Sequence, residues 1–176
     1  MNYLQKHVLR LADNALILGQ RLSEWCGHGP FLEEDIAITN TALDYVGRAR
    51  VLYSYAAEID EEVTRSEDYY AYNRDEEEFE NFQICELPVG DYAFTMVRQF
   101  LVDCYFNSLY GSLSHSENKK LASIASKVVK ESAFHLRRSR NWICRFGKGT
   151  NESRQRVGRA LNELWGYTDE LFEYDE

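Results

Sequence analysis

The chain has 176 residues, of which 44% are hydrophobic and 14% aromatic, and its formal net charge is −9 at pH 7. This length suits one domain with a full-sized core, so we expect a single domain over residues 1–176. The acidic balance argues against nucleic-acid binding, which needs a basic surface. No run of about 20 apolar residues occurs, so we expect no membrane-spanning segment. The amphipathic N-terminal stretch does not resemble a signal peptide.

The four cysteines are too far apart in sequence to form a CxxC pair. Three of them lie among apolar residues, which predicts buried free thiols in a reducing cytoplasm. We therefore expect a cytoplasmic protein. The cysteines are Cys26, Cys85, Cys104 and Cys144.

The first 59 residues show the pattern of a helical hairpin. Apolar residues recur every three or four positions over residues 3–26, which predicts one helix. Residues 26–30 read CGHGP, and such glycines and proline end helices. A second helix is predicted from about Leu32 to Ile59, with acidic residues in its first turn. The short turn between them makes the two helices antiparallel neighbours.

A strongly acidic connector follows, over about residues 59–90. Between Glu58 and Glu80 there are eleven acidic residues and two basic ones, Arg65 and Arg74, so this segment accounts for the whole net charge. We expect one or two short helices here. The charge run is interpreted as a solvated face, and a docking surface for a basic partner is the alternative.

The second half predicts another hairpin and a final helix. Asp91 is a good N-cap for a helix that ends near Leu113, and a polar turn leads to a helix over residues 117–146. Thr150 caps a last helix that reaches Trp165. Two long hairpins joined by one crossover define an all-α, ferritin-like four-helix bundle with extra short helices.

Folding the first hairpin about its turn near residue 29 places Asp44 level with residues 13–17, and folding the second about residue 117 places Asp103 level with Glu131. Four polar residues are therefore expected at one depth inside this bundle. They are Asp44, Asp103, Glu131 and His135. Di-iron bundles use a Glu from each of two helices and a Glu-x-x-His motif from each of the other two. Here Gly47 stands where a His is needed, and Glu131 lies four residues before His135 instead of three. The first helix offers Asp13, Asn14 or Glu24.

This broken pattern predicts no metal ligand and no catalytic residue in the chain. The four residues are interpreted as a degenerate metal site or as a buried polar network with Arg48, Arg98 or Arg137, because buried charges need partners. Some members could instead lie at the surface. A metal-dependent oxygenase that uses these four residues remains the alternative.

Tryptophan and arginine are enriched in protein interfaces, and several lie near predicted helix ends. These candidates for a partner interface are Trp25, Arg137, Arg138, Trp142 and Trp165.

Three stretches resemble a known family, the C subunits of phenylacetyl-CoA epoxidases (PaaC). The stretches are residues 15–50, 89–106 and 127–172, and the sequence RLSEWCGH followed by LEEDIA is the most specific part. The resemblance implies a non-catalytic, ferritin-like structural subunit of a bacterial multicomponent monooxygenase for aerobic phenylacetate degradation. In that family the A subunit holds the di-iron centre and epoxidises the aromatic ring, while the C subunit has no cofactor and stabilises it.

The resemblance also implies partners and a difference in length. The expected partners are the catalytic A subunit and other subunits of the complex. Family members are usually longer, so we expect this chain to lack the family's C-terminal helices, with a further chain as the other possible cover. The alternatives to a structural subunit are a ferritin-like oxygenase in its own right and an acidic helical binding module.

Overall fold

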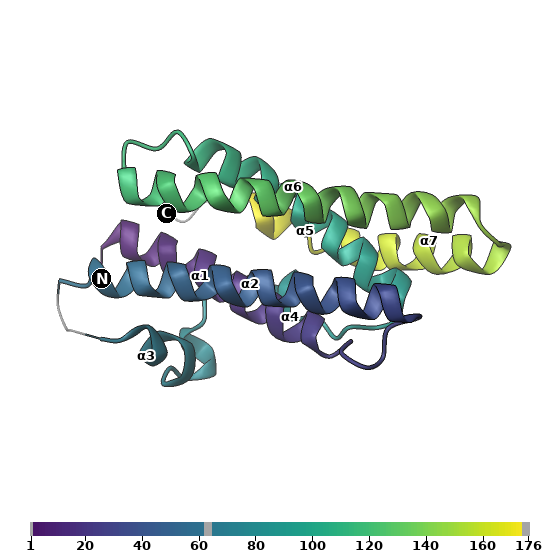
Figure 1. The fold of residues 1–176 in the computed structure, drawn as a ribbon, viewed down its shortest axis with the longest axis horizontal. Helices are drawn as coiled ribbons and strands as arrows, with labels where there is room; N and C mark the ends of the chain where they lie inside the picture. The colour runs from purple at the N-terminus through teal and green to yellow at the C-terminus, as the bar shows by residue number, and fades with distance from the viewer. Residues whose placement is uncertain (1, 62–64, 174–176) are drawn as a thin grey trace. The chain divides into compact units, whose positions relative to one another are not determined.

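The computed structural model describes residues 2–61 and 65–173, and the secondary structure of those residues is helical throughout (Figure 1). The all-α class predicted from the sequence is confirmed. The chain forms two compact units, residues 1–86 and 87–176, and each is described by itself. No helix within the described ranges is long and apolar enough to cross a bilayer.

The first unit is built on two long helices that lie side by side, α1 (Tyr3–Ser23) and α2 (Leu32–Glu58) (Figure 1). The side chain of Asn2 accepts a hydrogen bond from the Gln5 amide at 2.8 Å and so caps α1. The first helix ends three residues before the predicted Cys26. The predicted end of α2 is one residue beyond the observed one.

The turn between α1 and α2 is held by Asp35. Its carboxylate accepts hydrogen bonds from the amides of Gly29 at 2.9 Å and Gly27 at 3.2 Å. These two amides, with Gly29 the larger cause, lower the pKa of Asp35. Gly27 has a φ of 79°, a left-handed conformation that favours glycine. The turn therefore explains the need for the glycines in CGHGP.

Close packing of α1 on α2 depends on Gly19. A Cβ added there would lie 2.9 Å from Cγ2 of Val46 and 3.3 Å from the carbonyl oxygen of Ala42. The small residue thus lets the two backbones approach. The buried apolar residues of the two helices include Val8, Leu11, Ala12, Ala15, Leu18, Leu22, Ile38, Ala42, Leu52 and Ala56.

The acidic connector contains two short α-helices, α3 (Glu67–Tyr72) and α4 (Gln83–Glu86), with a 3₁₀ helix, η1 (Glu76–Glu78), between them. The side chain of Ser66 caps α3 by accepting from the Tyr69 amide. One or two short helices were expected, and the 3₁₀ turn is additional. Part of the acidic run, residues 62–64, lies outside the described residues.

The second unit contains three helices and a terminal 3₁₀ turn: α5 (Tyr92–Leu113), α6 (Lys119–Lys148), α7 (Asn151–Trp165) and η2 (Asp169–Phe172). Asp91 and Thr150 cap α5 and α7, as predicted. Helix α6 begins and ends two residues later than predicted, because Asn118 caps it by accepting from the amide of Leu121. The η2 turn was not predicted.

The cysteines correct one expectation. Cys85 is a buried free thiol, but Cys26, Cys104 and Cys144 are exposed. The prediction of buried thiols is wrong for these three. Cys104 and Cys144 lie on other helix faces than their apolar neighbours in sequence, and Cys26 lies in the turn after α1. Partial burial and then the charge of Asp103 raise the pKa of Cys104.

Candidate functional site

The four residues expected at one depth fall on both units. Asp44 lies on α2 of the first unit and is exposed, although the sequence placed it in the interior. In the second unit Asp103 and His135 are buried and Glu131 is half-buried. Within the described residues, no group of three or more His, Cys, Asp or Glu side chains is arranged to hold a metal ion.

Asp103 is held by a residue that the sequence analysis did not name. Its Oδ2 accepts a hydrogen bond from Oγ of Ser139 on α6 at 3.0 Å, and both residues are buried. Ser139 lies eight residues beyond Glu131, the residue expected opposite Asp103. The hydroxyl links α5 to α6 through a buried carboxylate, which is a structural role.

The first unit also differs from the expected register. Asp13 on α1 was expected opposite Asp44, but the phenolic hydroxyl that donates to Asp13 Oδ1, at 2.6 Å, belongs to Tyr53. Tyr53 lies nine residues further along α2. The residue of α2 that contacts Asp13 therefore lies closer to the acidic connector than the predicted register implied.

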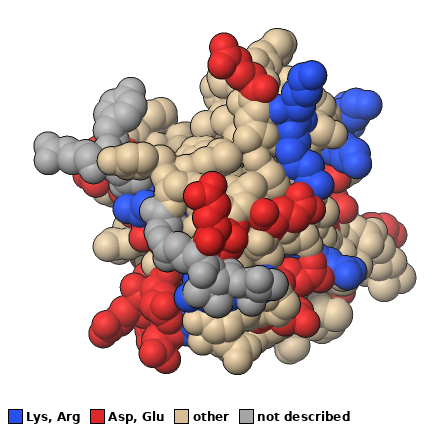
Figure 2. All heavy atoms as spheres, turned by 90° about the vertical axis from the view of Figure 1, so that its left-hand side faces the viewer, with Lys and Arg blue, Asp and Glu red and all other residues tan. Residues whose placement is uncertain are grey.

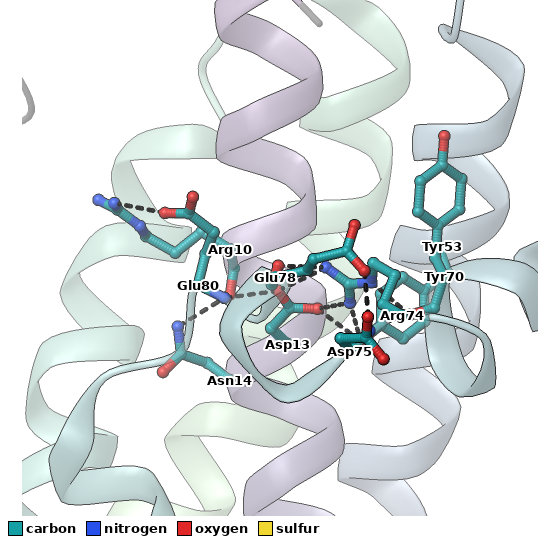
Figure 3. Close-up of polar contacts among 9 residues, drawn as sticks. All are labelled: Arg10, Asp13, Asn14, Tyr53, Tyr70, Arg74, Asp75, Glu78 and Glu80. Carbon is teal, nitrogen blue, oxygen red and sulfur yellow. Dashed lines mark hydrogen bonds and ion pairs between the residues drawn. The ribbon is translucent and has the colours of Figure 1, made fainter. Parts of the chain in front are cut away.

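Around Asp13, which is buried, the structure assembles a polar group that we call the Asp13 cluster: Asp13, Asn14, Tyr53, Arg74 and Glu80 (Figure 3). Asp13 is fully buried, and both of its oxygens accept from the guanidinium of Arg74, at 3.1 Å for the Nη1–Oδ2 contact. Oδ2 also accepts from the backbone amide of Glu80 at 2.9 Å. The carboxylate is thus paired and saturated by protein donors.

Arg74 ties the connector together as well as to α1. Its Nε donates to the carbonyl oxygen of Tyr70 at 2.7 Å, and its Nη1 donates to that of Glu78 at 3.0 Å. The guanidinium lies 4.2 Å from the ring centroid of Phe79, within cation–π distance. One side chain therefore joins α3, η1 and the following loop to the buried carboxylate.

Asn14, next to Asp13, fastens the other end of the connector. Its Oδ1 accepts from the Phe82 amide at 3.0 Å and from Sγ of Cys85 at 3.1 Å. Its Nδ2 donates to the carbonyl oxygen of Arg10. Asn14 of α1 thus holds both the segment before α4 and the thiol of Cys85 within α4.

Burial shifts the pKa values of the two partners of Asp13 in opposite directions, whereas the charge of Asp13 raises both. Burial, and next the negative charge of Asp13, raises the pKa of Tyr53 well above its ordinary value, so the phenol stays protonated. Burial alone would lower the pKa of Arg74, but hydrogen bonds and the charge of Asp13 raise it instead. The cluster is therefore a stable carboxylate–guanidinium pair with a neutral phenol.

A neighbouring chain of hydrogen bonds repeats this pattern at the start of the connector. Nε2 of Gln5 donates to the hydroxyl of Tyr70 at 3.0 Å, and that hydroxyl donates to Asp60 at 2.6 Å. Arg65 pairs with the same carboxylate at 3.2 Å. The two basic residues of the acidic run are thus both paired with aspartates.

Sequence reasoning named Asp13 and Asn14 but not their partners. The available signal was a pair of polar residues inside the apolar pattern of α1, together with Arg65 and Arg74 as the two bases among eleven acids. An arginine isolated among so many carboxylates is a good candidate for a specific ion pair. Which carboxylate it meets is a question of tertiary structure.

The interface candidates fall on both units. Trp25 is half-buried in the first unit, and the others lie in the second. Arg138 donates to the Tyr92 hydroxyl at 3.1 Å, and Trp142 packs on the same ring at 5.3 Å between centroids. Arg137 is exposed and lies over Phe134 at 5.5 Å.

Trp165 is different, since 62% of it is exposed. It lines an apolar cavity of about 630 Å³ in the second unit, together with Leu101 and Tyr105 of α5 and Phe172 of η2. Phe172 is also exposed.

Comparison with known proteins assigns the class. The chain belongs to the PaaA_PaaC family, described as phenylacetic acid catabolic protein, whose sequence profile matches residues 1–176. It is 47% identical over 176 residues to the protein of Escherichia coli (strain K12) that is named as the C subunit of 1,2-phenylacetyl-CoA epoxidase. The match covers all of this chain and 70% of that protein. The resemblance predicted from the sequence is confirmed, and the chain is shorter than this relative.

Proposed function

We propose that this chain is the non-catalytic structural subunit of a phenylacetyl-CoA epoxidase complex in the cytoplasm. In this proposal it pairs with the di-iron A subunit and stabilises it, while the A subunit epoxidises the ring in aerobic phenylacetate degradation. The chain itself holds no cofactor. Identity of 47% over the whole chain to a protein named as the C subunit of such an enzyme supports this role.

The proposal that the chain is not catalytic rests on the hydrogen bonds and ion pairs of its interior carboxylates. Asp13 accepts hydrogen bonds from Tyr53, Arg74 and the Glu80 amide, and Asp103 accepts one from Ser139. A carboxylate paired with a guanidinium and saturated by donors fixes the position of helices and connector. Both groups are thus engaged in holding structure.

Co-expression with the A subunit from the same organism tests the pairing. We expect the A subunit to be soluble and active in the presence of this chain, to co-purify with it, and to lose solubility or activity without it. An A subunit that is equally soluble and active alone would contradict the proposal.

Metal analysis separates this role from the alternative of an oxygenase in its own right. The chain is purified alone from iron-rich medium, as wild type and as His135→Ala. We expect iron far below one equivalent in both proteins. Near-stoichiometric iron in the wild type that is lost in His135→Ala would favour the enzyme and refute the structural role.

A further inference from the structure

Helix α2 has apolar residues on two opposite faces. At 100° per residue, Leu32, Ile36 and Leu43 lie within about 40° of one direction around the helix. These three are 71%, 53% and 63% exposed, and we call them the outer face of α2. Val46 borders this face, is 40% exposed, and lies close to Gly19 of α1. The buried residues of the helix, which include Ile38, Tyr45 and Leu52, lie on the opposite side.

A helix whose outer side faces only water is ordinarily polar there. The outer face of α2 instead runs from Leu32 to Leu43, about 16.5 Å along the helix axis at 1.5 Å per residue. Single exposed apolar residues need no explanation, but three in line opposite the core indicate an interaction surface. Its periodicity suits a second helix that packs along it.

A cavity adjoins this stripe and can anchor the same partner. It has a volume of about 280 Å³, and its apolar walls include Val46, Ala49 and Ala71. Tyr72, 75% exposed, and Asp68, which is also exposed, line it as well. Arg50 and Glu67, which pair with each other at 2.9 Å, also line it. A lysine or arginine of a partner would place its stem against the apolar walls and its charge near Asp68.

The charge distribution decides between a different chain and a second copy of this one. Residues 1–86 hold seven Lys and Arg against eighteen Asp and Glu, a net charge of −11, whereas residues 87–176 hold thirteen against eleven, a net charge of +2. Figure 2 shows a group of acidic side chains at the lower left of the face it draws. Pairing two copies through α2 would bring two strongly acidic units together, which electrostatic repulsion opposes.

Acidic residues also follow the stripe itself, while Arg50, in line with it seven residues beyond Leu43, pairs with Glu67 at 2.9 Å. Glu33 and Asp44 lie on one edge of the outer face, at about 100° and 120° on the same helical wheel. A partner helix with Lys or Arg beside its apolar residues complements both the edge and the cavity. Complementary charge chiefly speeds association and excludes wrong partners, while the apolar contact supplies affinity.

We propose that the outer face of α2, with the cavity beside α3, docks an amphipathic helix of the oxygenase's A subunit that carries basic residues beside its apolar stripe. This inference rests on the proposed function and names the surface used for that pairing. It differs from the tryptophan and arginine candidates that the sequence suggested.

The test compares two variants by how well each displaces the wild-type chain from its co-purified complex with the A subunit, which gives their relative Kd. Ile36→Glu/Leu43→Glu places two carboxylates in the stripe, where docking would have to bury them unpaired, and we expect at least a 100-fold higher Kd. Leu161→Glu on α7, where the leucine is 42% exposed, makes the same chemical change elsewhere and is expected to alter the Kd less than about threefold. Circular dichroism and the melting temperature check that the variants are folded.

Leu43→Gln gives a milder change, expected to raise the Kd about tenfold, if the double variant does not fold. Asp68→Lys tests the cavity and is expected to weaken binding with a shallower dependence on salt.

Three results would overturn the inference. If the wild type binds the A subunit and Ile36→Glu/Leu43→Glu binds equally well, the surface is wrong while the pairing stands. If the wild type does not bind the A subunit at all, the proposed function fails as well. If sedimentation of the wild type alone shows a dimer that the double variant abolishes, the occupant is a second copy of this chain.

Discussion

Arg74→Met tests whether the buried pair with Asp13 fastens the acidic connector to the first unit. Methionine keeps much of the apolar stem and removes the guanidinium. The side chains of Arg74 and Asp13 are 6% and 0% exposed, so the change leaves a carboxylate deep inside the unit without its counter-charge. It also removes the hydrogen bonds to the carbonyl oxygens of Tyr70 and Glu78.

The expected loss of stability depends on the contacts that Asp13 keeps when the guanidinium is removed. Removing one partner of a buried ion pair costs about 3–5 kcal/mol. Asp13 would keep its hydrogen bonds from Tyr53 and the Glu80 amide, which moderates the penalty, while the lost backbone contacts add about 1 kcal/mol. We expect the free energy of unfolding of the first unit to fall by about 3–5 kcal/mol. At a urea slope of about 2 kcal/mol/M, the midpoint falls by about 1.5–2.5 M.

Urea unfolding and amide hydrogen exchange measure the effect. Exchange over residues 65–86 should accelerate in Arg74→Met, because these residues lose their link to α1. Arg50→Met is the control: Arg50 pairs with Glu67 at 2.9 Å but is 77% exposed, so its loss should cost about 0–1 kcal/mol. Adding Asp13→Asn to Arg74→Met should recover about 1–2 kcal/mol by removing the buried charge.

The reasoning is refuted if Arg74→Met lies within about 1 kcal/mol of the wild type. The buried pair would also be refuted if Asp13→Asn/Arg74→Met were no more stable than Arg74→Met and amide exchange over residues 65–86 were unchanged.

Two further changes test individual contacts. Tyr53→Phe removes the hydroxyl that donates to Asp13 and should cost about 1–3 kcal/mol at pH 7. The pKa of Tyr53 is higher in the folded protein than in the unfolded chain, so the neutral phenol stabilises the fold below the ordinary pKa of 10.0. This stabilisation is lost as the pH rises above 10.0. An absorbance titration in which Tyr53 of the folded protein ionises near pH 10 would disprove the raised pKa. Gly90→Ala should cost about 1–3 kcal/mol in thermal or urea unfolding, because φ is 59° and the new Cβ would lie 2.9 Å from the Phe94 ring. Gly27→Ala, also at positive φ but with open space, should cost less, and equal losses would rule out the ring contact.

Helix positions were largely predictable because their signals are local. Asp91 and Thr150 cap helices by hydrogen bonds to amides three residues ahead, so the pattern is complete within a few positions. The end of α1 was misplaced because residues 24–26 continue a helix-like composition into turns. The 3₁₀ segments were difficult to predict because so short an element has little periodicity.

The buried cluster was predictable only in part. Asp13 and Asn14 stood out as polar residues in an apolar pattern, but Arg74 is 61 positions from Asp13. Asp44 was assigned to the interior from an assumed hairpin register, and the observed register places Tyr53 beside Asp13 instead. A change of register alters which residues of two neighbouring helices face each other. An interior position assigned from an assumed register can therefore be wrong.

The helical class, the two hairpins, the acidic connector and the family could be predicted from the sequence, because each depends on local periodicity or on residues read in order. The pairing of Asp13 with Arg74 and the apolar outer face of α2 became visible only in the folded chain. Both depend on which side of a helix meets its neighbour. Because α2 is apolar on two opposite sides, its sequence pattern cannot tell the core face from the docking face, and packing against α1 makes that distinction.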